Sequence, residues 1–160
     1  MINIRVGFGF DVHPLGTERE LWLGGIKLKF DKGCVGHSDA DVLLHAICDA
    51  LLGAANLKDI GFHFPNTDER YKGADSKLLL KEVVALLDKN GYGIGNVDST
   101  LSLEAPKINP HIEDMQNALA PIMNISVNDI SIKATTNEKL GYVGREEGVN
   151  AYAVALIYKK

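Results

Sequence analysis

Apolar and polar residues alternate over residues 3–13, and this alternation predicts a β-strand. One face of this strand carries Val6, Phe8, Phe10 and Val12, and the other carries Arg5, Gly7, Gly9, Asp11 and His13. Asp11 and His13 are two residues apart, so they share a face near the end of the strand, which we expect Pro14 and Gly16 to stop. The two glycines leave that face thin, so another element can approach the backbone closely.

The next apolar pattern predicts a β-hairpin. Residues 21–23 and 26–30 form its two arms, and the Gly24-Gly25 pair between them suits a two-residue turn. The second arm alternates cleanly, and its two lysines are expected to face solvent rather than to form a binding patch.

Residues 42–52 are apolar around most of a helical surface, which predicts a largely buried helix. We expect Ser38 to be its N-cap, with Asp41 completing a capping-box-like pair three residues later. Asp41, His45 and Asp49 are spaced by four residues and therefore form one polar stripe. Buried ionisable groups cost free energy unless they are paired or bind a metal. The free N–H groups at the helix start favour a phosphate or carboxylate.

Residues 59–68 are rich in glycine, proline, asparagine and aspartate, and we expect a loop there. Two interpretations of this loop stay open. Its histidine and two aromatic residues suit a lid over a binding site. They also suit a surface connection that buries one phenylalanine.

The second half of the chain predicts two helices and three strands. Asp75 is expected to cap a scaffold helix that ends at Asn90-Gly91. Asn109-Pro110 is expected to open another helix, with Asn109 as its N-cap, that Pro121 kinks or ends. The expected strands cover residues 94–104, 130–134 and 149–158. The last is apolar on both faces, which predicts a buried central strand.

Residues 135–139 and 141–148 offer further polar groups. The first segment ends in a carboxylate beside a lysine, which suits a grip on phosphate and metal. The alternative is a capped turn that feeds a short helical piece. The second segment is a glycine-punctuated loop that carries Arg145, Glu146 and Glu147.

These elements predict an α/β fold (an α+β sandwich), with a sheet of four or five strands and three helices on one face. The 160 residues suit a single domain spanning 1–160. A net charge of −4 argues against nucleic acid as a partner. We expect no membrane association, no signal peptide and a reducing, cytoplasmic location, because there are only two cysteines and no long apolar run. Cys48 is expected in the core.

Two histidines and one carboxylate, Asp11, His13 and His45, suit a catalytic zinc with one open position. Chain spacing alone does not show that these three residues meet in space, and other histidines compete as ligands: His37, His63 and His111. The alternative is that His45 is a core histidine bonded to Asp41 or Asp49. Those two aspartates also suit a supporting role that fixes the tautomer of His45. No nucleophile elbow, P-loop or dinucleotide fingerprint is present.

Ordered blocks along nearly the whole chain resemble the 2-C-methyl-D-erythritol 2,4-cyclodiphosphate synthase family. They are Gly9–His13, Gly36–Val42, Leu44–Ala46, Asp49–Ala54, Asp59–Gly61, Phe64–Asp68, Lys72–Ser76, Asn96–Asp98, Ala105–Lys107, Lys133–Thr136 and Glu138–Gly141. No block is specific alone, but the blocks are highly specific together. The resemblance implies a CMP-releasing, cyclising phosphorus–oxygen lyase of the non-mevalonate isoprenoid pathway. Its substrate is 4-diphosphocytidyl-2-C-methyl-D-erythritol 2-phosphate, whose 2-phosphate attacks the β-phosphorus.

The resemblance also implies an assembly and two metals. The family forms homotrimers with active sites between subunits. By resemblance, Asp11, His13 and His45 hold zinc, and Glu138 helps to hold a magnesium or manganese ion that binds with substrate. In some relatives a central cavity of the trimer binds isoprenoid diphosphates, and the corresponding positions here are Phe10, Arg145 and Glu147.

Further residues receive roles by resemblance alone. His37, with Ser38, and Thr136 match positions that stabilise the phosphoryl transition state. The methylerythritol and ribose side is matched by Asp59, Ile60, Gly61, Phe64, Pro65, Asn66, Thr67 and Asp68. The cytidine pocket of the neighbouring subunit is matched by Leu103, Glu104, Ala105, Pro106, Lys107, Ile108, Asn109, Ala134 and Thr135, and contacts with substrate phosphate are matched by Tyr142 and Arg145. Further substrate-binding positions are Asp11, Val12, His13, Asn137 and Glu138. The chain departs from the family pattern at His63, a candidate stray ligand, at Asn137, and at Glu146, which adds a charge near the cavity positions.

Intramolecular phosphoryl transfer needs alignment and charge neutralisation more than a covalent nucleophile. Two rival functions remain at this level. A zinc phosphohydrolase would release uncyclised product. A binding module with a structural metal would hold a phosphorylated ligand without chemistry, and a fourth protein ligand such as His63 would favour it.

Overall fold

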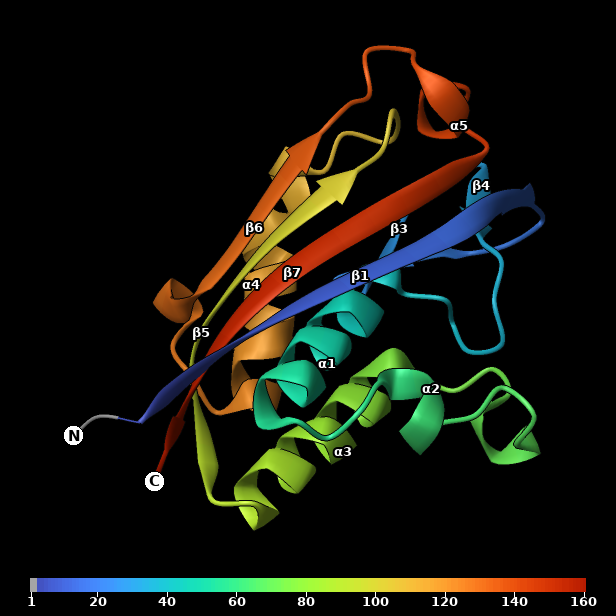
Figure 1. Ribbon diagram of the computed structural model, residues 1–160. Coiled ribbons are helices and arrows are strands. Elements are labelled where there is room, and N and C mark those ends of the chain that lie inside the picture. Colours follow the sequence, from blue (N-terminus) through green and yellow to red (C-terminus); the bar gives the residue numbers. More distant parts are fainter. Residues whose placement is uncertain (1–2) are drawn as a thin grey trace.

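The computed structural model describes residues 3–160 and contains a mixed sheet with helices on one face (Figure 1). The five-stranded sheet has the order β4-β1-β7-β5-β6, and β2 and β3 form a separate two-stranded sheet. The strands are β1 Ile4–Thr17, β2 Leu21–Leu23, β3 Ile26–Leu28, β4 Lys32–Cys34, β5 Tyr92–Ser102, β6 Ile130–Thr135 and β7 Gly148–Lys159. The helices are α1 Val42–Ala55, α2 Ile60–His63, α3 Ser76–Lys89, α4 Ile112–Met123 and α5 Gly141–Gly144, with 3-10 turns at Glu69–Tyr71, Asn109–His111 and Val127–Asp129.

The predicted fold class is therefore confirmed, including the strand count and the three longer helices on one face. The predicted hairpin is also confirmed, and Gly24 and Gly25 adopt positive φ angles of 63° and 77° at its turn. Asp75 caps α3 and Asn90 ends it, as expected. Cys34 and Cys48 are both buried.

Strand β1 is longer than the alternation predicted, because Pro14 and Gly16 do not stop it. It pairs antiparallel with β7 up to Pro14, and then Leu15–Thr17 pair with β4. The carbonyl of Pro14 accepts a hydrogen bond from the N–H of Val35, and the N–H of Leu15 donates to the carbonyl of Glu147, so backbone hydrogen bonds continue around the proline.

The glycine face of β1 lies directly against the backbone of α1. A Cβ atom on Gly7 would sit 1.9 Å from the carbonyl oxygen of Ala50, and one on Gly9 would sit 1.9 Å from that of Ala46. Any larger residue would push helix and strand apart. This confirms that the thin face admits another element, and it brings His45 of α1 next to Asp11 and His13 of β1.

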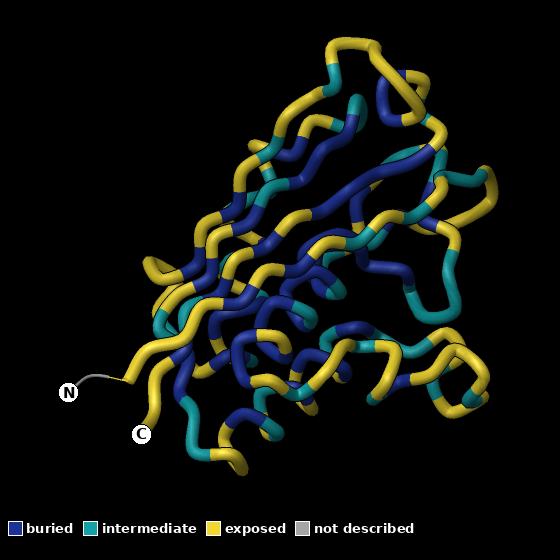
Figure 2. Tube along the Cα trace, in the orientation of Figure 1, coloured by how far each residue is buried: buried dark blue, intermediate teal, exposed yellow. Residues whose placement is uncertain are grey.

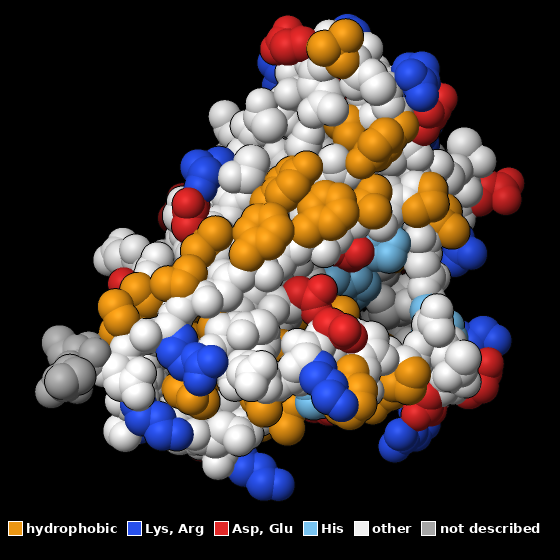
Figure 3. Space-filling view, viewed as in Figure 1, with side chains coloured by type: hydrophobic (Ala, Val, Ile, Leu, Met, Phe, Trp, Pro, Cys, Tyr) orange, Lys and Arg blue, Asp and Glu red, His pale blue; other side chains and the backbone are white. Residues whose placement is uncertain are grey.

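The opposite face of the sheet is apolar and exposed. Along β7, buried and exposed residues alternate (Figure 2), and Val154 is 42% exposed. The central position of β7 is confirmed, but its expected burial on both faces is wrong for the single chain, because no element within residues 3–160 covers this face. The apolar side chains form a continuous stripe across the sheet (Figure 3). We call this set the apolar stripe: Ile4, Val6, Phe8, Phe10, Val12, Tyr152, Val154 and Tyr158.

Three local predictions need correction. The segment 59–68 is not only a loop, because Asp59 caps the short helix α2. Asn109 and Pro110 open a 3-10 turn, and α4 begins after it without a side-chain cap. Pro121 does not end α4, which continues two residues to Met123. Among residues 3–160, the structure has no helix with the length and apolar character needed to cross a membrane.

Candidate metal and substrate site

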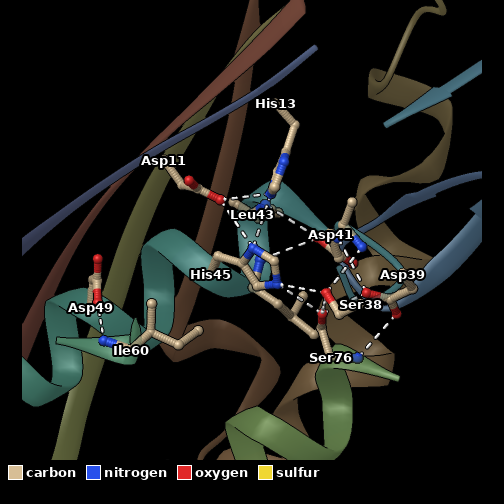
Figure 4. A network of polar contacts seen from close by, with 12 residues as sticks. Asp11, His13, Ser38, Asp39, Asp41, Leu43, His45, Asp49, Ile60 and Ser76 are labelled. Atoms are coloured by element: carbon tan, nitrogen blue, oxygen red, sulfur yellow. Dashed lines mark hydrogen bonds and ion pairs between the residues drawn. The ribbon is translucent and has the colours of Figure 1, made fainter. Parts of the chain in front are cut away.

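Asp11, His13 and His45 converge where β1 passes the first turn of α1 (Figure 4). Nδ1 of His45 lies 3.0 Å from Oδ2 of Asp11, and Nε2 of His13 lies 3.1 Å from the same oxygen. The two ring nitrogens are 3.1 Å apart. Each residue thus offers one ligand atom, and these atoms all lie within 4.8 Å of one another.

The donor set fits a divalent metal with an open position. Two imidazole nitrogens and one carboxylate oxygen are typical ligands of a catalytic zinc. Nδ1 of His13 lies 3.0 Å from the carbonyl oxygen of Val35, which can only accept a hydrogen bond. That contact favours a proton on Nδ1 and leaves Nε2 free for a metal. The three predicted ligands are therefore brought together, and the structure supports a metal without showing which one.

Asp11 and His13 shift each other's pKa values toward the charged forms. Burial alone would raise the pKa of Asp11, but the contacts of its carboxylate with the His13 and His45 rings outweigh burial and hold that pKa far below its ordinary value. Burial opposes protonation of His13, yet the contact of its ring with the Asp11 carboxylate raises the pKa of the ring. Asp11 is therefore ionised and suited to a cation at neutral pH.

The start of α1 differs from the predicted capping box. Asp41, not Ser38, is the N-cap, and its carboxylate accepts hydrogen bonds from the N–H groups of Leu43 and Leu44. The same carboxylate accepts from Gly24 at 3.1 Å and Gly25 at 2.7 Å in the hairpin turn. Asp41 is fully buried, which raises its pKa, and the N–H of Gly25 opposes that rise. One carboxylate thus ties the hairpin to the helix that carries His45.

Ser38 and His37 stand at the mouth of α1. The Ser38 hydroxyl accepts from the N–H of Ala40 at 3.1 Å and lies 3.2 Å from Nε2 of His45. The ring of His37 contacts the carbonyl of Asp68 at 3.2 Å. The backbone of His37 also accepts from the N–H of Gly73 at 2.7 Å. Ser38 therefore contacts a candidate metal ligand, and the neighbouring His37 contacts the segment that follows α2.

A cavity of about 280 Å³ opens beside the candidate ligands. It is lined by His13, Gly36, His37, Ser38, His45, Ile60, Gly61, Phe64, Asn66, Tyr71 and Leu79. Other predicted substrate residues are close to these in the sequence but do not line the cavity: Asp11, Val12, Asp59, Pro65, Thr67 and Asp68. The carboxylate of Asp59 caps α2, and that of Asp68 binds the guanidinium of Arg70 at 2.6 Å.

A second pocket of about 360 Å³ lies at the ends of β5 and β6. Its lining residues are Leu103, Glu104, Pro106, Lys107, Ile108, Asn109, Pro110, Ala134, Thr135 and Thr136. Thr136 and all the other lining residues except Pro110 have roles assigned by the family resemblance, and the residues other than Thr136 were assigned to the cytidine pocket. The structure therefore brings this set together, although Ala105 does not line the pocket. The two pockets share no residue.

Glu138 lies beside this second pocket on the loop after β6. The hydroxyl of Thr136 donates to its carboxylate at 3.2 Å. Glu104 holds the same loop, accepting from the N–H groups of Asn137 at 2.9 Å and Lys139 at 3.2 Å. Burial would raise the pKa of Glu104, but these N–H groups and the Lys139 ammonium outweigh it and lower that pKa. Within this chain Glu138 is not part of the Asp11–His13–His45 group.

Tyr142 and Arg145 have partners of their own in the chain. The hydroxyl of Tyr142 donates to Asn150 at 2.5 Å. The guanidinium of Arg145 pairs with Glu147 at 2.9 Å, so two of the three expected cavity residues contact each other. Their expected contacts with phosphate or an isoprenoid diphosphate remain predictions.

The competing histidines do not join the candidate metal group. Nε2 of His63 contacts the carbonyl of Leu57 at 2.7 Å, and His63 is not in the group formed by Asp11, His13 and His45. Asp49 does not contact His45 either, because its carboxylate accepts from the N–H of Ile60 at 2.7 Å. Within residues 3–160, Asp11, His13 and His45 form the only such three-residue group.

Sequence reasoning missed two residues next to His45: Ser76, which contacts the ring directly, and Asp39, which contacts it through the Ser76 hydroxyl. Ser76, the first residue of α3, places its hydroxyl 3.0 Å from Nε2 of His45, and Asp39 accepts a hydrogen bond from that hydroxyl. Chain spacing gave no signal for this contact, because 31 residues separate Ser76 from His45. The one available signal was that both residues fall within blocks that carry the family resemblance.

Comparison with known proteins agrees with this geometry. The model of the YgbB family matches residues 4–158. Two proteins named 2-C-methyl-D-erythritol 2,4-cyclodiphosphate synthase are similar along their length. The protein from Cytophaga hutchinsonii is 69% identical over 158 residues, 99% of each chain. The protein from Parabacteroides distasonis is 60% identical, over 99% of this chain and 98% of its own.

Solved structures give the same result. IspF of Plasmodium falciparum in a CDP complex matches with a TM-score of 0.87 and 34% identity, covering 99% of this chain and 97% of that one. The bifunctional IspDF from Campylobacter jejuni matches with a TM-score of 0.96 and 38% identity, and this chain spans 43% of its length. Fold, ligand cluster and full-length similarity together show that the chain belongs to the YgbB family, the family of the 2-C-methyl-D-erythritol 2,4-cyclodiphosphate synthases.

Proposed function

We propose that this chain is a cyclising phosphorus–oxygen lyase. It converts 4-diphosphocytidyl-2-C-methyl-D-erythritol 2-phosphate to 2-C-methyl-D-erythritol 2,4-cyclodiphosphate and CMP. The observation that carries the proposal is the convergence of Asp11, His13 and His45 beside a cavity, in a chain that matches the family over residues 4–158. The relatives' names state this product, and two neighbouring structures hold CDP.

In the proposed reaction, an oxygen of the 2-phosphate forms a bond to the β-phosphorus. The bond between that phosphorus and the bridging oxygen breaks, and CMP leaves with the oxygen and its electron pair. No protein nucleophile is needed. The two cysteines support this view, since both are buried and burial raises the pKa of Cys34 to about 12.

The residues around the cavity suit alignment and charge stabilisation. Asp11, His13 and His45 would hold zinc, which when bound supplies a positive charge to a phosphate oxygen. Ser38 already accepts from Ala40, so its own proton is free to donate to the substrate. His37 lies beside Ser38 and lines the same cavity. These donors stabilise charge that develops on phosphoryl oxygens.

Thr136 and Glu138 are proposed to act on the nucleotide side. Their contact at 3.2 Å places a hydroxyl and a carboxylate together at the edge of the second pocket. Glu138 would help to hold magnesium or manganese on the diphosphate, and the Thr136 hydroxyl would then turn its single proton from Glu138 to a phosphoryl oxygen. The pocket formed by Leu103–Asn109 with Ala134 and Thr135 would receive the cytidine.

We further propose a homotrimer in which neighbouring subunits join the two pockets. The pockets share no lining residue within one chain, so one substrate would reach both across a subunit boundary. The apolar stripe supports this assembly, because Phe8 and Val6 are each 64% exposed on the single chain. Phe10, Arg145 and Glu147 would face a central cavity suited to an isoprenoid diphosphate. The free cysteines support a cytoplasmic location.

The test is phosphorus NMR of the purified protein with the cytidyl substrate and magnesium. We expect cyclic diphosphate and CMP in equal amounts, and neither after a chelator has removed the metal. Linear phosphates would instead indicate a metal-dependent hydrolase. Unchanged substrate that is nevertheless bound would indicate a binding module, and either result would overturn the proposal.

A further inference from the structure

The ring of His45 is held at both nitrogens. Nδ1 faces Asp11 and His13, and Nε2 faces the opposite way, toward the start of α3 (Figure 4). There the Ser76 hydroxyl lies 3.0 Å from Nε2, and the Ser38 hydroxyl lies 3.2 Å from it. Ser76 is fully buried, so no bulk solvent competes for this contact.

Asp39 determines the direction of these hydrogen bonds. Its Oδ1 accepts from the hydroxyl of Ser76 at 2.5 Å, and its Oδ2 accepts from the backbone N–H of Ser76 at 3.0 Å. An ionised carboxylate has no proton to donate. The single hydroxyl proton of Ser76 therefore points at Asp39, and the free lone pairs of Ser76 can only accept. The contact with His45 is then a bond from Nε2–H to Ser76.

We propose that Ser76 and Asp39 are positioning residues that keep the proton of His45 on Nε2 and thereby present the Nδ1 lone pair to the metal. The inference rests on the metal site proposed above. A metal-bound histidine commonly donates its other N–H to a second partner, which fixes both tautomer and ring orientation. Here that partner is a buried hydroxyl whose own proton is fixed by a carboxylate.

The two aspartates that sequence reasoning assigned to this supporting role are occupied elsewhere. Asp41 accepts from the hairpin turn and the first turn of α1, and Asp49 accepts from the N–H of Ile60. Asp39 instead connects two helix starts, since its N–H also donates to the carbonyl of Ala74 at 3.0 Å. The relay from Asp39 through Ser76 thus places His45 of α1 relative to α3.

The test measures metal affinity without substrate, using zinc alone and a competing chelator. We expect Ser76→Ala and Asp39→Asn each to weaken zinc binding about 10- to 100-fold, the range for partners that support metal ligands. Ser99→Ala is the matched control, because Ser99 is a buried serine whose hydroxyl donates to the carbonyl of Ser131 at 2.9 Å in the sheet. Asp75→Asn is the second control, since Asp75 caps α3 without contacting the Ser76 hydroxyl.

A spectroscopic measurement separates positioning from a general loss of structure. In zinc-loaded protein with ¹⁵N-labelled histidine, the Nε2–H of His45 should give a slowly exchanging, downfield proton signal. This signal should broaden or disappear in Ser76→Ala and persist in both controls. Zinc affinities of Ser76→Ala and Asp39→Asn within twofold of the controls, or an unchanged Nε2–H signal, would overturn the relay while leaving the proposed reaction intact. Absence of zinc binding by the unmodified chain would instead refute the proposed metal site.

Discussion

Asp41 is the residue whose removal should most clearly show how the site is supported. Replacing it with alanine removes one carboxylate that accepts four backbone N–H groups, two in the hairpin turn and two in the first turn of α1. The side chain is fully buried, so water cannot replace it as an acceptor. His45 lies one turn further along the same helix. The change therefore tests stability and metal placement together.

The expected loss of stability follows from counting these donors. Each buried donor left without an acceptor costs about 1–3 kcal/mol. Removing a buried carboxylate also relieves its own desolvation, so we take the low end for all four and expect about 4 kcal/mol for Asp41→Ala. Asp41→Asn keeps the oxygen that accepts three of the bonds but turns an amide N–H toward Gly25. One lost bond should cost about 1–3 kcal/mol.

The assay is urea unfolding of the metal-free protein, at one protein concentration because assembly would shift the apparent stability. Asp75→Ala is the control, because Asp75 caps α3 through one bond at a partly exposed position and should cost about 1 kcal/mol. The central expectation is that Asp41→Ala is the least stable protein, Asp41→Asn is intermediate and the unmodified chain is the most stable. If Asp41→Ala lost no more stability than Asp75→Ala, the four-donor argument would be refuted.

Four further outcomes are expected. Glu104→Gln should lower the Tm at neutral pH, because folding lowers the pKa of Glu104 below its ordinary 4.5. The stabilisation by the ionised Glu104 is present above pH 4.5 and is lost as the pH falls through the pKa of Glu104 in the folded protein. The Tm of the variant and that of the unmodified chain should therefore become equal at low pH. His45→Ala should abolish bound zinc by atomic absorption and all CMP release, and retained zinc would contradict the ligand assignment. Gly9→Ala should cost about 2 kcal/mol or more in urea unfolding, since its Cβ would lie 1.9 Å from the carbonyl of Ala46. Phe8→Glu should convert the proposed trimer to folded monomer by light scattering and circular dichroism, and an unchanged mass would count against the proposed interface.

Periodicity along the chain was sufficient for most elements. The alternation in β1, the double glycine between β2 and β3, and the apolar helix α1 each act over a few residues, and the structure confirms all three. The glycines of β1 carried further information. Their lack of side chains predicted a close approach, which the backbone of α1 makes.

Periodicity could not show which apolar face meets the core. The residues at the exposed face of β7 are as hydrophobic as core residues, and Tyr152 is 38% exposed and Val154 is 42% exposed. A sequence pattern reports that a face avoids water, not whether a helix or another subunit covers it. The same limit explains the extension of β1 past Pro14, which depends on pairing with the distant strand β4.

The N-cap of α1 was misassigned because local rules cannot separate two good caps. Ser38 and Asp41 both suit an N-cap, and they are three residues apart. The hairpin turn decides between them, because the N–H groups of Gly24 and Gly25 need a buried acceptor and Asp41 supplies it. The metal ligands could be predicted from residue type and from the family resemblance. Ser76, which contacts His45, could be identified only from the packing of α3 against α1.

The polar stripe of α1 shows how one helix positions a whole site. The sequence placed Asp41, His45 and Asp49 on one face, with the two aspartates as candidate partners of His45. The structure gives each a different contact: Asp41 holds the hairpin, His45 joins the metal cluster, and Asp49 holds the N–H of Ile60 at the start of α2. Successive residues four apart thus fix a neighbouring hairpin, the ligands and one wall of the cavity to a single rigid helix. A shift of α1 would disturb all three at once, which is why its close packing on the glycines of β1 matters for function as well as stability.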